Sequence, residues 1–243
     1  MITNLAYFYE TSRKLRGGKW VWVKDSNGEQ RGNVLLGGTI LNPKKGFDHL
    51  YAAQLVQYTP ADGCLIFRSF KVQAATSAAT DTEIFVEGDG YSDAPEVGMV
   101  IIKAPESLEV ETLTVDEGVV TKTVAEYTGQ SAKITAVVFD EANKKFKVTL
   151  DNALGALTTD DILVEATGTA KAADAKVLVK NPNTFIEADR DLMPTEGYGI
   201  RPESANYSIS TVYNKQAWIA RMQPLPKYVL AKNKSLIDGI FWI

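Results

Sequence analysis

Apolar and polar residues alternate with a period of two through much of the middle of the chain. The pattern is clearest in residues 132–140 and 145–150, two segments joined by the short connection Glu-Ala-Asn-Lys. Ile134 and Val138 mark the apolar phase of the first segment, and Val148 marks that of the second. Successive side chains of a strand point to opposite faces, so this alternation predicts a half-buried antiparallel β-hairpin.

Other short segments around this hairpin are rich in β-branched residues. They are residues 64–72, 82–86, 97–102 and 119–124. Combinations of Gly, Asp and Pro that favour turns separate them. Strands at this spacing predict a mainly β fold, in which residues 64–180 form a β module that is an antiparallel β-sandwich or a small barrel.

The residues before this β module have a mixed character. Residues 20–24 alternate and are followed by an Asn-Gly turn, which predicts a hairpin with residues 30–36. Residues 47–56 fit one or two turns of helix, which the turn-forming residues after them would end. We therefore treat residues 1–63 as an N-terminal arm and hairpin region.

The residues after the β module are irregular and punctuated by proline. Residues 206–213 and 216–222 fit the two strands of a second hairpin, although the latter segment also fits a helix. Pro224 and Pro226 then predict an extended path, because proline lacks the amide donor that regular pairing needs. We expect residues 181–243 to pack with the N-terminal region, so that the β module is inserted between them.

Composition and charge narrow the class of protein. The chain has 243 residues and is 45% hydrophobic, which is ordinary for a globular protein with a sizeable core. Its formal net charge is -4, from 26 basic and 30 acidic residues. Non-specific binding to nucleic acid needs a basic face, so we expect no direct contact with nucleic acid.

A single cysteine and the absence of targeting patterns bear on location. Cys64 has no second cysteine to pair with, and we expect a small buried side chain in a protein that folds in a reducing cytoplasm. The first residues lack a basic segment before an apolar stretch, and no apolar run approaches the length that spans a bilayer. The sequence predicts a protein that is neither exported by the usual route nor embedded in a membrane.

Residue types that carry chemistry are sparse. His49 has no Cys or His neighbour at ligand spacing, and Asp189 with Asp191 is too common a pair to indicate a glycosidase. Six acids lack the spacing of a calcium-binding loop and are expected to be solvated turn formers: Asp81, Glu83, Glu87, Asp89, Asp93 and Glu96. The sequence predicts no catalytic residue, no metal site and no cofactor, and therefore a protein that is not an enzyme.

Two parts of the chain resemble virion proteins of tailed bacteriophages. The stretches KITAVVFD (133–140) and FKVTLDNALGALTTDDILV (146–164) form a hairpin that leads to Ala-Leu, then Asp and an apolar strand, as in the β modules of those proteins. The stretches WIARMQPLP (218–226) and DGIFWI (238–243) are similar to auxiliary head proteins of phages that infect gut Bacteroidota, including the crAss-like group.

The resemblance implies a virion structural protein, namely a capsid auxiliary or decoration protein that stabilises the head or displays a β domain. Its implied partners are the lattice of the major capsid protein and other virion proteins, and self-association stays open. The implied location is the capsid surface, after synthesis in the cytoplasm of the bacterial host. Two other roles also fit: a tail, connector or head-fibre component, and a carbohydrate-binding β-sandwich module.

Large apolar side chains near the two ends are the candidates for the partner interface. A chain that is otherwise well charged has little reason to leave them on a free surface. The candidate interface residues are Tyr7, Phe8, Trp20, Trp22, Phe241, Trp242 and Ile243. Extended terminal segments of this kind can add backbone pairing to exposed strand edges of capsid subunits.

Overall fold

The structure of the chain is a computed structural model. It describes residues 40–44, 48–51, 54–59, 61–88, 93–116, 119–186, 190–192 and 222–231. The described residues are mainly β, which confirms the predicted fold class. The hairpins predicted for residues 20–36 and 206–222 lie outside the described residues, apart from Met222.

The fold is built on a closed antiparallel barrel of six strands. They are β4 (Ser69–Ala74), β5 (Glu83–Glu87), β6 (Val100–Lys103), β9 (Ser131–Asp140), β10 (Lys145–Leu150) and β11 (Ile162–Thr167). The strands pair in the order β4-β5-β10-β9-β6-β11, and β11 pairs with β4, so that the ring closes. A short strand, β12 (Lys176–Val177), pairs with the last residues of β11. Each of the six strands thus has a partner on both sides, although β9 beyond Ile134 pairs with β10 alone.

The apolar phase of these strands fills the barrel. In β10, Phe146, Val148 and Leu150 are buried between half-exposed neighbours, as the alternation of the sequence predicts. The interior cluster consists of Phe70, Val72, Ile84, Val86, Ile101, Ala132, Ile134, Phe146, Val148, Leu150, Leu154, Leu157 and Leu163. Burial of one large apolar side chain contributes about 1.5–3 kcal/mol, so this cluster is a main source of the barrel's stability.

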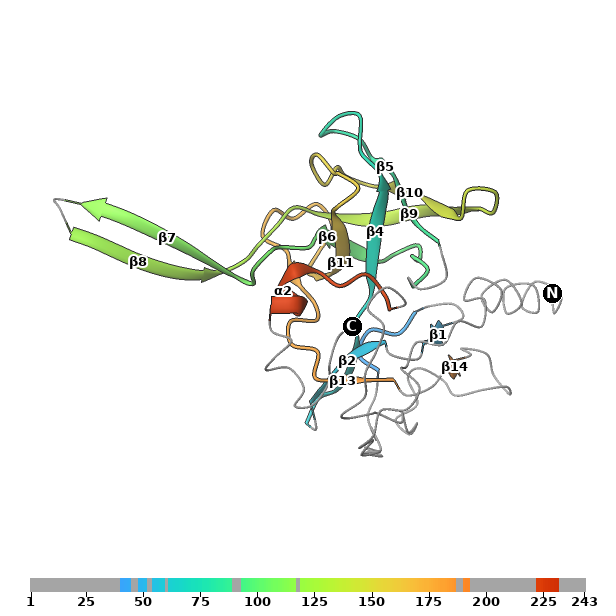
Figure 1. Cartoon of the computed structure of the whole chain (residues 1–243), viewed down its shortest axis with the longest axis horizontal. Coiled ribbons are helices and arrows are strands. Elements are labelled where there is room, and N and C mark those ends of the chain that lie inside the picture. Colours follow the sequence, from blue (N-terminus) through green and yellow to red (C-terminus); the bar gives the residue numbers. More distant parts are fainter. Residues whose placement is uncertain are drawn as a thin grey trace.

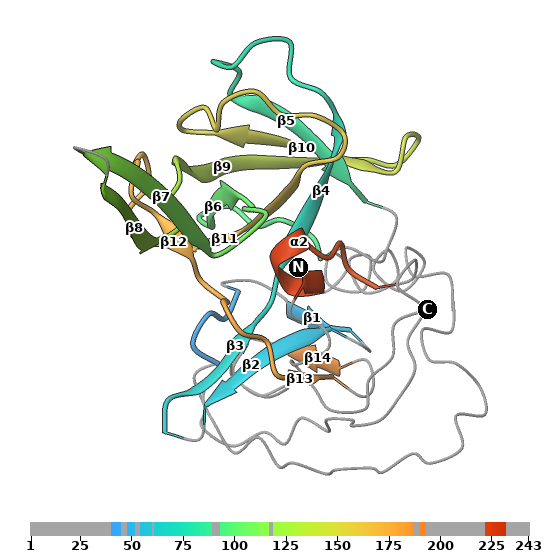
Figure 2. The ribbon, with the colours of Figure 1, turned by 60° about the vertical axis from the view of Figure 1, so that its left-hand side comes forward.

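The wall formed by β6 and β11 is buried on both faces. Ile101 and Leu163 belong to the interior cluster, whereas the next residues, Ile102 and Val164, belong to a second cluster outside the barrel. Residues 222–229 complete this outer cluster, in part through the short helix α2 (Lys227–Ala231), which lies between the barrel and the lower sheet in Figure 2. The C-terminal part of the described chain therefore covers one wall of the barrel.

Two small sheets join segments that are far apart in the sequence. They contain β2 (Leu55–Thr59), β3 (Gly63–Ile66) and β13 (Thr184–Phe185) in one, and β1 (Asp48–Leu50) and β14 (Arg190–Leu192) in the other. Residues before position 64 thus pair with residues after position 180. The predicted boundary at residue 64 falls within β3.

Three local predictions are wrong. Residues 47–56 contain β1 and the start of β2 rather than a helical turn, because pairing with β14, β3 and β13 overrides the local pattern. Residues 64–72 form two strands, since the chain leaves β3 before Phe67 and re-enters a sheet after Arg68. The predicted extended path past Pro226 gives way to α2, whose first turn tolerates a preceding proline.

A long two-stranded ribbon leaves the barrel between β6 and β9. It consists of β7 (Glu109–Asp116) and β8 (Val119–Glu126), which pair antiparallel along their whole length. Figure 1 shows it projecting away from the rest of the molecule. We call residues 109–116 and 119–126 the arm.

Replacing Phe70 with alanine tests the barrel core. Phe70 is 1% exposed and lies in the interior cluster, so we expect Phe70→Ala to lower the free energy of unfolding by about 3–5 kcal/mol in urea denaturation. Val138, which is 61% exposed on β9, provides the control, and Val138→Ala should change that free energy by no more than about 0.5 kcal/mol. Equal losses in the two variants would contradict this placement of the core.

Candidate functional site

The arm is the candidate functional site. It connects β6 to β9, two neighbouring strands of the barrel, and all eight residues of β7 and all eight of β8 are exposed. An isolated pair of strands is only marginally stable in water. A ribbon of this length with both faces in solvent is therefore typical of an element that is completed by a partner.

Aliphatic side chains gather on the arm. Ten large hydrophobic residues are exposed in the described part of the chain, and six of them are in the arm: Val110, Leu113, Val115, Val119, Val120 and Val124. Leu113 is 65% exposed and Val115 is 68% exposed. Since contiguous exposed apolar surface marks interaction sites on soluble proteins, the arm is the strongest interface candidate among the described residues.

The register of the two strands divides the arm into two faces, because residues directly opposite each other share a face. The face we call the threonine face contains Val110, Thr112, Thr114, Asp116, Val119, Thr121, Thr123 and Ala125. The face we call the charged face contains Glu109, Glu111, Leu113, Val115, Val120, Lys122, Val124 and Glu126. Asp116 is the one ionisable residue of the threonine face, so that face is almost free of charge.

Charge is distributed unevenly between the two strands of the arm. β7 carries Glu109, Glu111 and Asp116, whereas β8 carries Lys122 and Glu126. The Nζ atom of Lys122 lies 2.6 Å from Oε1 of Glu111. Both side chains are more than half exposed, so this ion pair contributes at most about 1 kcal/mol. The pair places opposite charges on neighbouring strands of the charged face.

Within the described ranges, the body of the protein contacts the arm at its base. The carboxylate of Glu126 accepts a hydrogen bond from Lys176 at 2.5 Å and also pairs with Lys180, and these two contacts lower its pKa. The amide of Tyr127 donates to the carbonyl of Leu108 at 2.8 Å, and both side chains pack against the outer cluster. The point at which the arm leaves the barrel is thereby fixed, while the rest of the ribbon stays in solvent.

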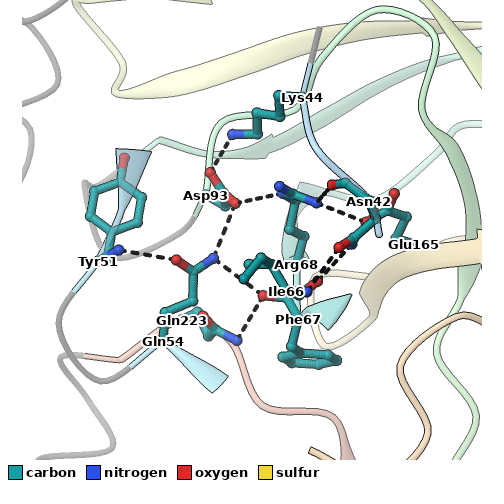
Figure 3. A network of polar contacts seen from close by, with 10 residues as sticks. All are labelled: Asn42, Lys44, Tyr51, Gln54, Ile66, Phe67, Arg68, Asp93, Glu165 and Gln223. Carbon is teal, nitrogen blue, oxygen red and sulfur yellow. Dashed lines mark hydrogen bonds and ion pairs between the residues drawn. The ribbon is translucent and has the colours of Figure 1, made fainter. Parts of the chain in front are cut away.

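A buried polar cluster lies at one end of the barrel (Figure 3). Arg68 directly precedes β4, and Glu165 lies on the neighbouring strand β11, opposite the start of β4. Nη1 of Arg68 is 3.3 Å from Oε2 of Glu165, and its Nε is 3.3 Å from Oδ2 of Asp93. Nζ of Lys44 lies 2.5 Å from Oδ1 of Asp93. Two cations and two acids therefore alternate in a largely buried chain of ion pairs.

Three side-chain amides extend this cluster across the fold. Asn42 donates to the glutamate of the cluster at 2.8 Å. Gln54 donates to Asp93 at 3.3 Å, and Gln223 donates to the carbonyl of Phe67 at 3.2 Å. The network thus links four parts of the fold: the segment before β1, the sheet of β2, β3 and β13, the barrel, and the C-terminal segment. It is a structural junction between parts that are far apart in the sequence.

Burial dominates the electrostatics of Glu165. Loss of hydration raises the pKa of this carboxyl, although the charge of Arg68 and the hydrogen bond from Asn42 oppose that rise. Removing one member of a buried ion pair leaves an uncompensated charge, which is strongly destabilising. The cluster therefore favours the one arrangement of segments in which all its charges are matched.

Sequence reasoning missed this cluster. Asp93 was predicted to be a solvated turn former, but it is 1% exposed and paired with Lys44, so that prediction is wrong. The available signal was Arg68, a charged residue inside the apolar run 64–72. A charge that interrupts such a run is either at a bend or buried with a partner, and here both are true.

Three other acids of the expected turn-forming group lie nearer the surface. Glu83 pairs with Lys147 at 2.9 Å, and Glu87 pairs with Lys71 at 3.2 Å. Asp81 accepts a hydrogen bond from the backbone of its own turn at 2.9 Å. Within the described ranges, no group of three His, Cys, Asp or Glu residues is placed to hold a metal ion.

The remaining candidates for chemistry fall largely outside the described parts. Asp89 and Asp189 are outside the described residues. The backbones of His49 and Asp191 face each other in the β1–β14 pair, whereas their side chains are outside the described part of the structure. Cys64 is buried, as predicted, and burial raises the pKa of its thiol to about 11, so the thiol stays protonated at neutral pH.

The predicted interface residues near the two ends, Tyr7, Phe8, Trp20, Trp22, Phe241, Trp242 and Ile243, all lie outside the described residues. Their role stays a prediction. No helix in the described part of the chain is both long and apolar enough to cross a membrane.

The chain matches no protein family model, no curated protein sequence and no solved structure. Its function must therefore be inferred from the geometry of the arm and of the buried cluster.

The pH dependence of stability tests the buried cluster. Because the folded-state pKa of Glu165 lies above its ordinary value of 4.5, this residue favours folding at low pH, and that contribution is lost as pH rises through the folded-state pKa. We expect the free energy of unfolding of the wild-type protein to fall relative to that of Glu165→Gln as the pH is raised above 4.5. Urea denaturation at a series of pH values measures this difference, and a relative gain of the wild type with rising pH would contradict it.

Proposed function

We propose that this protein is a virion structural protein, a capsid auxiliary or decoration protein of a tailed bacteriophage, and that the arm makes contacts between subunits of the particle. The observation that carries the proposal is the arm itself, exposed on both faces and rich in aliphatic side chains. An element of this kind suits a protein whose surface is completed by assembly. The resemblance of two segments to phage virion proteins is the reason for naming a phage particle as that assembly.

The body of the protein suits the same role. A closed barrel leaves little free strand edge for unwanted pairing, while the arm offers two unpaired edges at a defined position. The base contacts of Glu126 and Tyr127 set the direction of the arm before any partner binds. Preorganisation of this kind lowers the entropy cost of association.

The chemistry of the exposed side chains favours a protein partner over a sugar. Sugar-binding sites stack aromatic rings on exposed faces, whereas the large exposed hydrophobic residues of the described chain are all aliphatic. Tyr127 packs against the outer cluster, and Tyr91 lies outside the described residues. Aliphatic side chains on strands suit packing against another β protein.

Removing the arm tests the proposal. Replacing residues 109–126 with a short Gly-Ser turn leaves the barrel strands and the buried cluster intact, so we expect the thermal transition of the isolated protein to change little. The same variant should fail to join particles that lack the protein, as measured by co-sedimentation and gel analysis. A matched replacement of the exposed turn at residues 141–144 should join them normally. Normal incorporation of the variant without the arm would refute the proposed role of the arm.

The terminal segments provide a second, independent test of the virion role. If the residues predicted at the ends anchor the protein to the shell, deletion of residues 241–243 should leave the isolated fold nearly intact and abolish incorporation into particles. If those residues only fill the protein's own core, the deletion should lower the melting temperature, since loss of a buried Trp costs about 3–5 kcal/mol. A truncated protein that melts early yet still decorates shells would refute the terminal interface.

A further inference from the structure

We propose that the partner of the arm is the arm of a second copy of this chain, and that β7 of one copy pairs with β8 of the next to close a ring of copies. The inference rests on the proposed assembly role of the arm and names its partner. It is carried by the register of the two strands and by the distribution of charge between them.

The arm already shows which strand fits beside β7. Within one copy, β8 supplies the partners Thr123 for Thr112 and Thr121 for Thr114, together with the ion pair between Glu111 and Lys122. Each strand of a two-stranded ribbon uses one edge for this pairing and leaves the other edge open. The open edge of β7 therefore presents the same side chains, in the same order, to a second β8.

Charge and the number of edges left open separate the three ways in which two arms can pair. β7 beside β7 brings together two strands that each carry three acids, Glu109, Glu111 and Asp116, and is disfavoured by repulsion. β8 beside β8 brings together two strands that each hold one cation, Lys122, and one acid, Glu126, so charge does not oppose it, but it leaves the acidic β7 edge of both copies unpaired. β7 beside β8, in the register of the single arm, places Lys122 of one copy diagonally across from Glu111 of the next, and Glu109 opposite Glu126, so it repeats both contacts of one arm.

The geometry of this pairing also suits a closed assembly. Neighbouring strands in β7-β8-β7-β8 order alternate in direction when all arms point the same way, so the antiparallel pattern of the single arm continues from copy to copy. The bodies then lie together at one end, where the bases of the arms are fixed. This contact is head-to-tail, and a head-to-tail contact that closes gives a cyclic oligomer with no free strand edge.

Closure covers aliphatic surface as well as edges. One face of every arm turns toward the axis of the ring, and each face carries aliphatic residues, Val110 and Val119 on the threonine face and Leu113 and Val115 on the charged face. Side chains that are exposed in one copy thus become partly buried in the ring. Assembly therefore pairs the open backbone groups of the arm and covers its exposed apolar side chains at the same time.

Light scattering on the full-length protein gives the first test. We expect a discrete mass that is a whole multiple of the 26.6 kDa chain, and a shift toward the monomer for Val120→Asp. Val120 is 63% exposed on the arm and Val138 is 61% exposed on β9, so Val138→Asp is a matched control that should keep the oligomeric mass. A wild-type protein that is monomeric at all concentrations, or a Val138→Asp variant that dissociates as fully as Val120→Asp, would overturn the inference.

Cross-linking identifies the strand edges in contact. Copies with Thr112→Cys are co-expressed with copies that carry Thr123→Cys and oxidised with copper-phenanthroline, which joins only thiols in direct contact as a disulfide. We expect a covalent dimer in the mixture and none in either variant alone, because residue 112 faces residue 123 across the proposed contact. Cys64 is buried and does not compete. A dimer formed by Thr112→Cys alone or Thr123→Cys alone would overturn the proposed pairing.

These experiments separate the inference from the proposed function. An oligomer with the expected cross-link that fails to join particles would leave the ring in place and refute the virion role. A monomer that joins particles through an intact arm would refute the ring and leave the virion role in place.

Discussion

The pairing of β6 with β11 is the contact on which the rest of the structure depends. It closes the sheet into a barrel, so the interior cluster is shielded on all sides. It also forms the wall whose outer face, at Ile102 and Val164, receives the C-terminal segment. Because closure fixes β6 between β11 and β9, it fixes the place from which the arm leaves the barrel. The core, the covering layer and the arm therefore all depend on this one strand pairing.

Two parts of the molecule break the usual rule for polar and apolar residues, in opposite directions. The cluster around Arg68 places charges in the interior, and each of the four charged groups there lies within ion-pair distance of an opposite charge. The arm places aliphatic residues in solvent, where the described chain offers them no cover. Buried charges that are matched serve the fold itself. Exposed apolar groups that are unmatched indicate contacts with another molecule.

Much of the barrel could be predicted from the sequence, but little of the candidate site could. Alternation in residues 132–150 predicts the hairpin of β9 and β10, because one face of each strand must turn toward the core. The predicted buried phase holds at Ile134 and is wrong at Val138, which is 61% exposed, because the register of the hairpin shifts between Thr149 and Leu150. The split between β3 and β4 and the burial of Asp93 depend on contacts with residues far away in the chain, such as Lys44 and Glu165, and no local pattern encodes those contacts. Tertiary pairing likewise decides against a helix in residues 47–56.

The arm escaped sequence reasoning for a different reason. Residues 119–124 are predicted as a strand, and this prediction is confirmed as part of β8. Period-two alternation and β-branched residues describe a strand equally well whether a core or a partner covers it. The distinguishing signal was the composition of the threonine face, with threonine and valine on both strands and one ionisable residue, but its meaning depends on knowing that no part of the described body lies against it.

Hydrogen exchange at the arm tests the central claim, that β7 and β8 are completed by a partner. Half of the backbone amides in an isolated two-stranded ribbon point to open edges and exchange with solvent quickly, whereas paired amides are protected. We expect slower exchange across residues 109–116 and 119–126 in the assembled protein than in the protein diluted to single copies, with the turn at residues 141–144 unchanged. Equal exchange of the arm amides in the two states would contradict it.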